Sequence, residues 1–128
     1  MQMRAIYPRQ GLYPTGGDYI HALEVKRCKR LLYVAGTMGL DCDGRPGTTL
    51  DDQLRLVWAN IAAILAEAGM STDNIVRVTS YLTNRDQIDA NQAARLKALN
   101  GRAVPTTAIV VATLSDDWLI EIEVVAAA

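Results

Sequence analysis

Two glutamates alternate with isoleucines near the end of the chain, in the segment Ile120-Glu121-Ile122-Glu123. Side chains alternate between the two faces of a strand, so Glu121 and Glu123 are expected to share a face. A partly buried carboxylate is suited to holding a water molecule for attack on a substrate, because its surroundings alter its acidity. This segment is therefore where the sequence first indicates chemistry.

The glutamates lie in the second strand of a predicted antiparallel hairpin. Two runs rich in β-branched residues flank residues 115–117, which are of types that favour a turn. Pairing across a three-residue turn predicts Glu121 opposite Val111 and Glu123 opposite Ile109. Both carboxylates are then expected among apolar neighbours of the adjacent strand.

Other elements must support this hairpin. Apolar residues recur at helical spacing from Thr49 to Ala68, after a capping signal and before a glycine, which predicts a helix. Residues 75–82 alternate as a strand does, and a second cap opens a weaker helix from Asn84 to about Leu99. Nearer the start, residues 3–8 predict a short edge strand. Residues 22–26 and 31–35 predict two strands joined as a hairpin.

The strands are grouped at both ends of the chain instead of alternating with helices. This order favours a single α+β domain over residues 1–128, with two helices packed on one face of a mixed sheet. The other face is expected to expose valine, isoleucine and leucine from the last two strands. An exposed apolar surface of that size predicts self-association with closed symmetry.

Composition narrows the class of protein. A net charge of -1 gives no overall attraction to nucleic acid or membrane lipid, and no run is long enough to cross a bilayer. The start of the chain lacks the apolar region of a secretory signal, so we expect a cytoplasmic protein. Two separated cysteines and a single histidine, His21, form no metal-ligand cluster of familiar spacing, so no metal is expected.

The order and spacing of several short segments resemble the Rid family of reactive-intermediate (enamine and imine) deaminases, also described as L-PSP endoribonuclease-like. The resemblance covers nearly the whole chain. The segments are Gly17-Asp18-Tyr19, Val34-Ala35-Gly36, Glu67-Ala68-Gly69, Asn74-Ile75-Val76-Arg77-Val78, Ala90-Asn91, Pro105-Thr106-Thr107 and Ile120-Glu121-Ile122-Glu123.

The resemblance implies a chorismate-mutase-like fold and a homotrimer with ligand clefts between neighbouring subunits. It also implies hydrolysis of 2-aminoacrylate and related enamines or imines to 2-keto acids and ammonium, without metal or organic cofactor. By the same resemblance Glu121 positions the catalytic water, and Tyr19 and Asn91 line the substrate pocket.

The family's carboxylate-binding arginine has no counterpart. Counting from Pro105 places Thr107 at its position, whereas counting back from Glu121 places Thr106 there. A guanidinium holds a carboxylate by two charge-assisted hydrogen bonds, each worth roughly 1.5 to 3 kcal/mol against about 1 for a neutral bond. A substrate without a carboxylate, or with one held by another group, is therefore expected. Arg102 and Arg77 are the nearest cations along the sequence.

Two functional hypotheses follow. The first is a cytoplasmic homotrimeric hydrolase of enamines or imines with a non-standard substrate preference, in which Glu121 is catalytic and Tyr19, Asn91, Thr106 and Thr107 bind the substrate. The second is a non-catalytic small-molecule-binding or regulatory trimer of the same family. The basic turn at residues 26–30 also allows a ribonuclease, but no histidine pair or aromatic stacking surface accompanies it, so a nucleic-acid partner is disfavoured.

Overall fold

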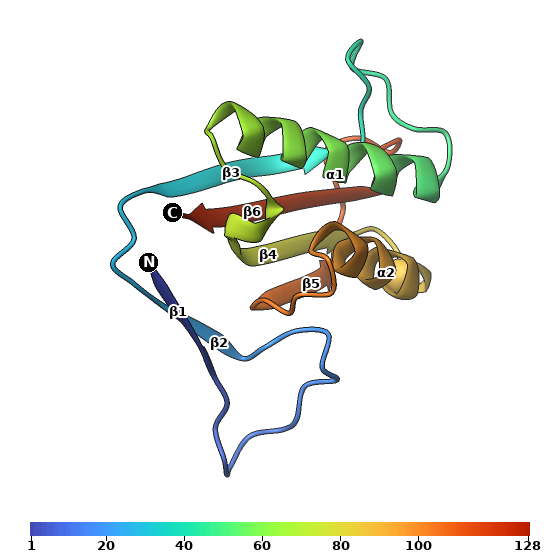
Figure 1. Ribbon diagram of the computed structural model, residues 1–128. Coiled ribbons are helices and arrows are strands. Elements are labelled where there is room, and N and C mark those ends of the chain that lie inside the picture. The colour runs from blue at the N-terminus through green and yellow to red at the C-terminus, as the bar shows by residue number, and fades with distance from the viewer.

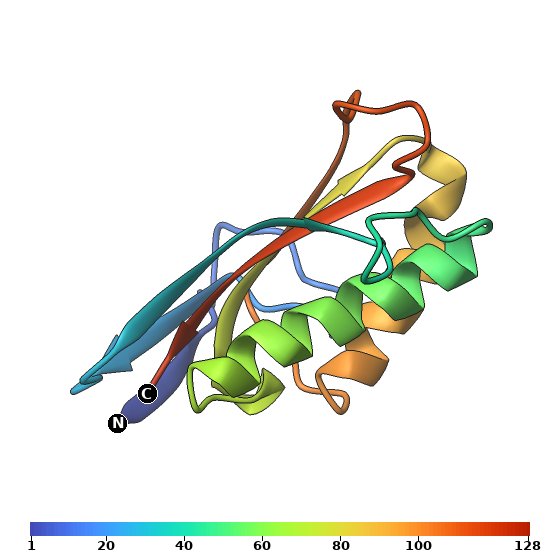
Figure 2. The same ribbon diagram turned by 90° about the horizontal axis from the view of Figure 1, so that it is seen from above.

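The computed structural model describes residues 1–128, and its main body is a four-stranded sheet with two helices on one face (Figure 1). The sheet contains β3 (Leu31–Met38), β4 (Ile75–Leu82), β5 (Thr106–Val110) and β6 (Ile120–Ala127), and the helices are α1 (Leu50–Glu67) and α2 (Ile88–Ala98). Figure 2 shows both helices on the same side of the sheet. The predicted α+β class, with two helices on one face of a mixed sheet, is confirmed.

Both predicted caps form, one at the start of α1 and one at the 3₁₀ turn that leads into α2. The Asp52 N–H donates to Thr49 Oγ1 at 3.1 Å, which satisfies one of the backbone donors that the first turn of α1 leaves free. Asn84 caps the short 3₁₀ turn η2 (Arg85–Gln87), and Gln87 Oε1 accepts from the Asn84 N–H in return. Because α2 continues directly from η2, this reciprocal cap fixes where the second helix enters the fold.

The strand order is β3-β6-β4-β5, which places β6 inside the sheet. It runs antiparallel to both β3 and β4, while β5 runs parallel to β4. The predicted hairpin of the last two strands is therefore wrong, because β4 lies between them. The unit β4-α2-β5 has the form that parallel strands require, since they need a crossover connection such as a helix.

The glutamates consequently have different neighbours from those predicted. Glu121 is opposite Tyr81 on β4 and Met38 on β3, and Glu123 is opposite Thr79 on β4. The turn at residues 115–117 does form, with the Trp118 N–H donating to the Ser115 carbonyl at 3.1 Å. A local turn, however, does not decide which strands pair when a third strand can bury more surface between them.

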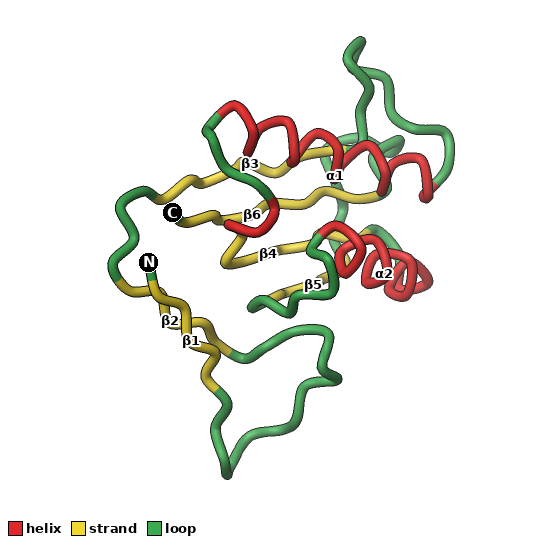
Figure 3. Tube along the Cα trace, in the orientation of Figure 1, coloured by secondary structure: helices red, strands yellow, loops and turns green.

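The second predicted hairpin is also wrong. β2 (Ala22–Lys26) pairs antiparallel with β1 (Gln2–Ile6) in a separate two-stranded sheet, whereas β3 pairs with β6 in the main sheet. Figure 3 shows β1 and β2 apart from the helices, joined by a long loop. Both strands were themselves predicted, so the error concerns their pairing.

The core lies between the helices and the sheet. Ile120, Ile122 and Val124 of β6 are at most 2% exposed, whereas the intervening Glu121 and Glu123 are half-buried on the opposite face. The predicted alternation of β6 is thus confirmed. No helix has the length and apolar character needed to cross a membrane.

The sheet face away from the helices, here called the open face, is less apolar than predicted. Tyr33 on β3 is 73% exposed and Ile109 on β5 is 47% exposed. Between them β4 contributes Arg77, Thr79 and Tyr81, which alternate with the buried residues of that strand. The open face therefore combines exposed apolar side chains with a polar row.

Candidate functional site

A cavity of about 370 Å³ lies between the loop before β2, helix α2 and the start of β5. Four of the five predicted site residues line this cavity: Tyr19, Asn91, Thr106 and Thr107. The remaining lining residues are Tyr13, Asp18, Leu82, Ile88, Gln92, Arg95 and Ala108. Segments far apart in the sequence thus meet around a space suited to a small molecule.

Helix α2 contributes the polar side chains of the cavity wall. Asn91 and Arg95 are one turn apart and therefore share a face, and each is only 3% exposed. Asn91 Oδ1 and Arg95 Nε are buried and have no hydrogen-bond partner within the chain. Buried polar groups are normally paired, so these two atoms are exceptions within the cavity wall.

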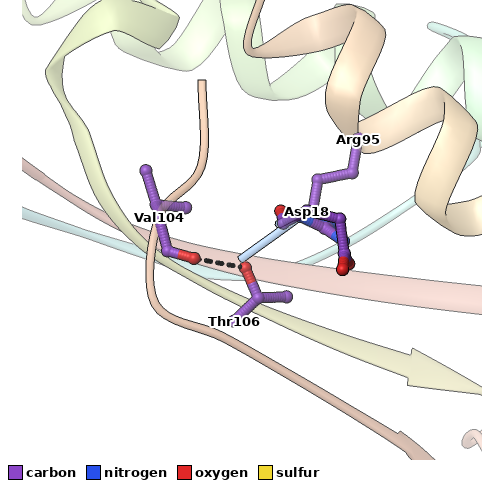
Figure 4. A network of polar contacts seen from close by, with 4 residues as sticks. All are labelled: Asp18, Arg95, Val104 and Thr106. Atoms are coloured by element: carbon purple, nitrogen blue, oxygen red, sulfur yellow. Dashed lines mark hydrogen bonds and ion pairs between the residues drawn. The ribbon is translucent and has the colours of Figure 1, made fainter. Parts of the chain in front are cut away.

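Arg95 forms the main ion pair of the cavity. Its Nη1 donates to the Asp18 carbonyl at 2.7 Å, and its Nη2 donates to Asp18 Oδ2 at 2.8 Å. Figure 4 shows the Arg95 side chain extending from α2 to Asp18, with Thr106 nearby. Arg95 was not predicted as a site residue: its spacing from Asn91 was the only local signal, and its partner is 77 residues away.

The two arginines that the sequence analysis considered have other roles. Arg102 Nη2 donates to the carbonyls of Thr72 and Ile75 at 2.8 and 2.9 Å, which holds the 3₁₀ turn η1 (Thr72–Asn74) against β4. Arg77 Nη2 donates to Thr107 Oγ1 at 2.9 Å. Arg77 therefore brings a guanidinium to the edge of the cavity, whereas Arg102 is held by the backbone.

The two threonines face opposite sides of β5. Thr106 is opposite Val78, whose side chain is in the core, and its hydroxyl donates to the Val104 carbonyl at 2.9 Å. Thr107 is opposite Thr79, on the open-face side. Both threonines line the cavity because β5 is the edge strand of the sheet. At this edge the cavity contacts residues from both faces of the strand.

The fifth predicted residue, Glu121, is not among the residues that line the cavity. It lies on the open face of β6, and its side chain packs against Gly36 of β3. A Cβ atom at Gly36 would lie 2.9 Å from Glu121 Cδ, which is closer than real Cβ contacts allow. The glycine therefore leaves room for the carboxyl group.

The neighbouring glutamate is engaged by β4. Tyr81 Oη donates to Glu123 Oε1 at 2.5 Å. This hydrogen bond raises the pKa of Tyr81 above 10.0, with further contributions from desolvation and from the charges of Glu123 and Glu121. The carboxylate of Glu123 therefore has a partner within the chain.

Comparison with known proteins places this geometry in a family. The model of a family described as Endoribonuclease L-PSP matches residues 13–128. A solved structure of YyfB from Yersinia pestis, of the conserved Rid protein family, is similar over 100% of both chains, with a TM-score of 0.86 and 28% identity. The present chain belongs to the Rid family.

Curated relatives agree with this assignment. A RutC family protein of Pyrococcus abyssi, PYRAB12510, is 33% identical over 133 residues, which cover 98% of each chain. The RutC family protein YjgH of Escherichia coli is 35% identical over 80 residues, or 59% of this chain. That match spans 61% of YjgH, less than two thirds of its length.

His21 of this Rid protein lies beside the cavity. Its ring makes edge-to-face contacts with Tyr13 and Tyr19, at centroid distances of 5.3 and 6.3 Å. Both ring nitrogens are buried without a hydrogen-bond partner. His21 therefore supports the two tyrosines by packing, since both of them line the cavity.

The basic turn before β3 is partly occupied by contacts within the chain. Lys26 Nζ is 3.3 Å from Glu24 Oε2, and Arg30 Nη1 donates to the Ala68 carbonyl at 2.8 Å. Arg30 thereby binds the C-terminal end of α1, where carbonyl groups lack helical partners. No three His, Cys, Asp or Glu side chains are arranged so that they could hold a metal ion.

Proposed function

We propose that this Rid protein hydrolyses reactive enamines or imines and releases ammonium. The supporting observation is that four residues selected by the family resemblance, from three separate segments, line one cavity of small-molecule size. Asn91 is buried in its wall, and its amide oxygen has no hydrogen-bond partner within the chain. Tyr19, Thr106 and Thr107 complete the proposed substrate-binding set.

In the proposed reaction an enamine first tautomerises to its imine. Glu121 then takes a proton from a water molecule while the water oxygen forms a bond to the C=N carbon, and the nitrogen accepts a proton. The C–N bond of this tetrahedral carbinolamine breaks, the hydroxyl proton is lost, and the products are a carbonyl compound and ammonia, which becomes ammonium. The balance requires only the substrate and water, so no cofactor is included in the proposal.

The position of Glu121 supports a site shared between subunits. Glu121 lies on the open face, apart from the residues that line the cavity of the same chain. The open face also exposes Tyr33 and Ile109, which favours its burial against another copy. We therefore propose a homotrimer in which Glu121 of one subunit completes the cavity of its neighbour.

The activity is tested with imines generated in place. An amino-acid oxidase supplies imines that carry a carboxylate, and an amine oxidase supplies imines that do not. Semicarbazide competes for each imine, so enzymatic hydrolysis lowers the yield of semicarbazone. The protein should accelerate hydrolysis, and Glu121→Ala should abolish the acceleration while retaining the wild-type oligomeric state. No acceleration over buffer for either class of imine would exclude the proposed reaction.

Mixing two inactive variants tests the shared site. Glu121→Ala chains and Asn91→Ala chains are unfolded together and refolded as mixed trimers. If the two residues act from different subunits, about a quarter of the clefts regain both groups under random mixing in a closed ring. The control mixture contains Glu123→Ala chains in place of the Glu121→Ala chains, together with the same Asn91→Ala chains. Recovery of no activity would show that both groups act from one chain.

A binding function without catalysis is the second candidate. It is favoured by the loss of the family arginine at Thr106 or Thr107 and by the engagement of both Arg95 terminal nitrogens with Asp18. Tight ligand binding in the cavity together with no hydrolysis of any imine would support it. Ribonuclease activity is not proposed, since Lys26 and Arg30 of the basic turn are already engaged.

A further inference from the structure

The cavity contains a charged pair whose two members are not equally accessible. The side chain of Arg95 is 4% exposed and that of Asp18 is 19% exposed. Both terminal nitrogens of the guanidinium already donate to Asp18, one to its carbonyl and one to its carboxylate. The Nη1–Nη2 face of the guanidinium is therefore occupied by Asp18, Arg95 Nε is buried, and the more accessible end of the pair is negative.

One donor of the neighbouring groups, the Thr106 hydroxyl, is also used within the chain. Thr106 lines the cavity and donates its hydroxyl proton to the Val104 carbonyl (Figure 4), so its hydroxyl oxygen is left as an acceptor. Asp18 Oδ1 receives no hydrogen bond from Arg95, whereas Asn91 Oδ1 is buried out of reach of a ligand. Two acceptors thus belong to the wall: Asp18 Oδ1 and Thr106 Oγ1.

We propose that the Asp18–Arg95 pair makes this cavity select ligands that donate N–H hydrogen bonds, such as an amide, an amidine or an iminium group, and reject carboxylates. A carboxylate beside Asp18 would meet a like charge, because the Arg95 guanidinium is engaged with Asp18 and Arg77 reaches only Thr107 at the edge of the cavity. An N–H group would instead donate to the acceptors of Asp18 and Thr106. The inference specifies the ligand class of the proposed substrate cavity and rests on that assignment.

Three probes of nearly the same shape test the selection: benzoate, benzamide and benzamidine. Binding to the wild-type protein is measured by titration with NMR chemical shifts as the readout. Benzamide and benzamidine should each bind at least about tenfold more tightly than benzoate, the ratio expected when charge-assisted or neutral donors replace an uncompensated anion. Equal or tighter binding of benzoate, or binding of none of the three, would overturn the proposal.

Two variants test whether the pair causes the preference. Asp18→Asn keeps the shape and an acceptor for Arg95 but leaves the guanidinium charge uncompensated, so benzoate should gain about tenfold and benzamidine should lose affinity. Arg95→Met keeps an unbranched buried side chain but removes the cation, so benzamidine should gain and benzoate should remain weak. Unchanged ratios in folded preparations of both variants contradict the inference.

A third variant locates the binding. Ile88 lines the cavity and is 50% exposed, so Ile88→Trp should fill the cavity without disturbing the core. It should weaken benzamide and benzamidine at least about tenfold, as loss of a buried contact surface does. Retained affinity would place the probes elsewhere and overturn the proposal. The probes are unreactive, so ligand selection is measured independently of imine hydrolysis. The predicted selection can be found in a protein that hydrolyses no imine, and it can be absent from one that does.

Discussion

Gly36 and Glu121 illustrate how one glycine positions a carboxylate. The Glu121 side chain occupies the space that a Cβ atom at Gly36 would need. β3 is irregular at this point, because its register against β6 shifts between Val34 and Thr37. Such bulges redirect side chains next to functional sites, so this one sets where the proposed catalytic carboxylate lies.

Gly36→Ala should therefore displace the Glu121 carboxyl group without removing it. The contact is with the end of a flexible side chain, so the free energy of unfolding should change by less than about 0.5 kcal/mol. Misplacement of a reacting group by 1 Å can cost about a hundredfold, so imine hydrolysis should fall by one to two orders of magnitude. Steady-state assays measure the rate of imine hydrolysis in Gly36→Ala, and Ala35→Ser at the neighbouring position is the control. Full activity in Gly36→Ala would argue against a catalytic Glu121.

Tyr81 supplies the pH dependence of the open face. Its hydrogen bond to Glu123, followed by desolvation and the nearby carboxylate charges, raises its pKa above 10.0. The protonated phenol is thus favoured in the folded protein. Its contribution to stability is complete below the unfolded pKa of about 10 and is lost as the pH rises through the higher folded pKa.

A spectroscopic titration should resolve this group. Of the five tyrosines, one should ionise at higher pH than the others when tyrosinate absorbance is followed. That late component should disappear in Tyr81→Phe and persist in Tyr33→Phe. The stability difference between wild type and Tyr81→Phe should also shrink above about pH 10. Loss of the late component in Tyr33→Phe instead would show that the assignment is incorrect.

At the scale of elements, α1 is joined to two loops by one buried side chain. Gln53 is 2% exposed, and its Nε2 donates to the carbonyls of Gly47 and Asp117 at 2.9 and 2.8 Å. Its Oε1 accepts from the Leu119 N–H at 2.9 Å. These three bonds fix the chain just before β6 and thereby help to set the register of the strand that carries Glu121.

Gln53→Ala should destabilise the protein by at least about 2 kcal/mol, because it leaves buried backbone groups without partners. Chemical denaturation measures the change. Glu67→Ala, at an exposed position of the same helix, is the control and should remain within about 0.5 kcal/mol of wild type. If both variants were equally stable, the hydrogen bonds of Gln53 would not hold the loop against α1.

At the scale of the molecule, the two faces of the main sheet differ in how completely they are covered. The helical layer shields one face of the sheet (Figures 1 and 2). The open face exposes Tyr33 and Ile109. Burying that face requires another protein surface, and a closed ring of identical chains provides one without leaving an unpaired surface.

Tyr33→Glu should therefore convert the proposed trimer into monomers, because a charge would be desolvated at the interface. Light scattering after size-exclusion chromatography measures the mass. Ile64→Glu is the matched control: Ile64 is also an exposed apolar residue, at 41%, but it lies on α1 in the helical layer. Dissociation of Ile64→Glu with an intact Tyr33→Glu trimer would place the interface on the helices.

The sequence by itself determined the elements and their faces. The cap at Thr49, the bounds of β4 and the alternation of Ile120 with Glu121 were all predicted, because helix and strand periods depend on local backbone geometry. Tyr19 and Asn91 were predicted as pocket residues through the resemblance to the Rid family. That resemblance rests on the order of short segments along the chain.

Only the tertiary structure decided which segments meet. It inserted β4 between β5 and β6, paired β2 with β1, brought Arg95 to Asp18, and left Glu121 away from the cavity of its own chain. These outcomes depend on contacts between segments tens of residues apart, where packing and charge compensation choose among partners with equal local propensity. A periodic pattern shows which face of a strand is buried, but it carries no information about which neighbour buries it.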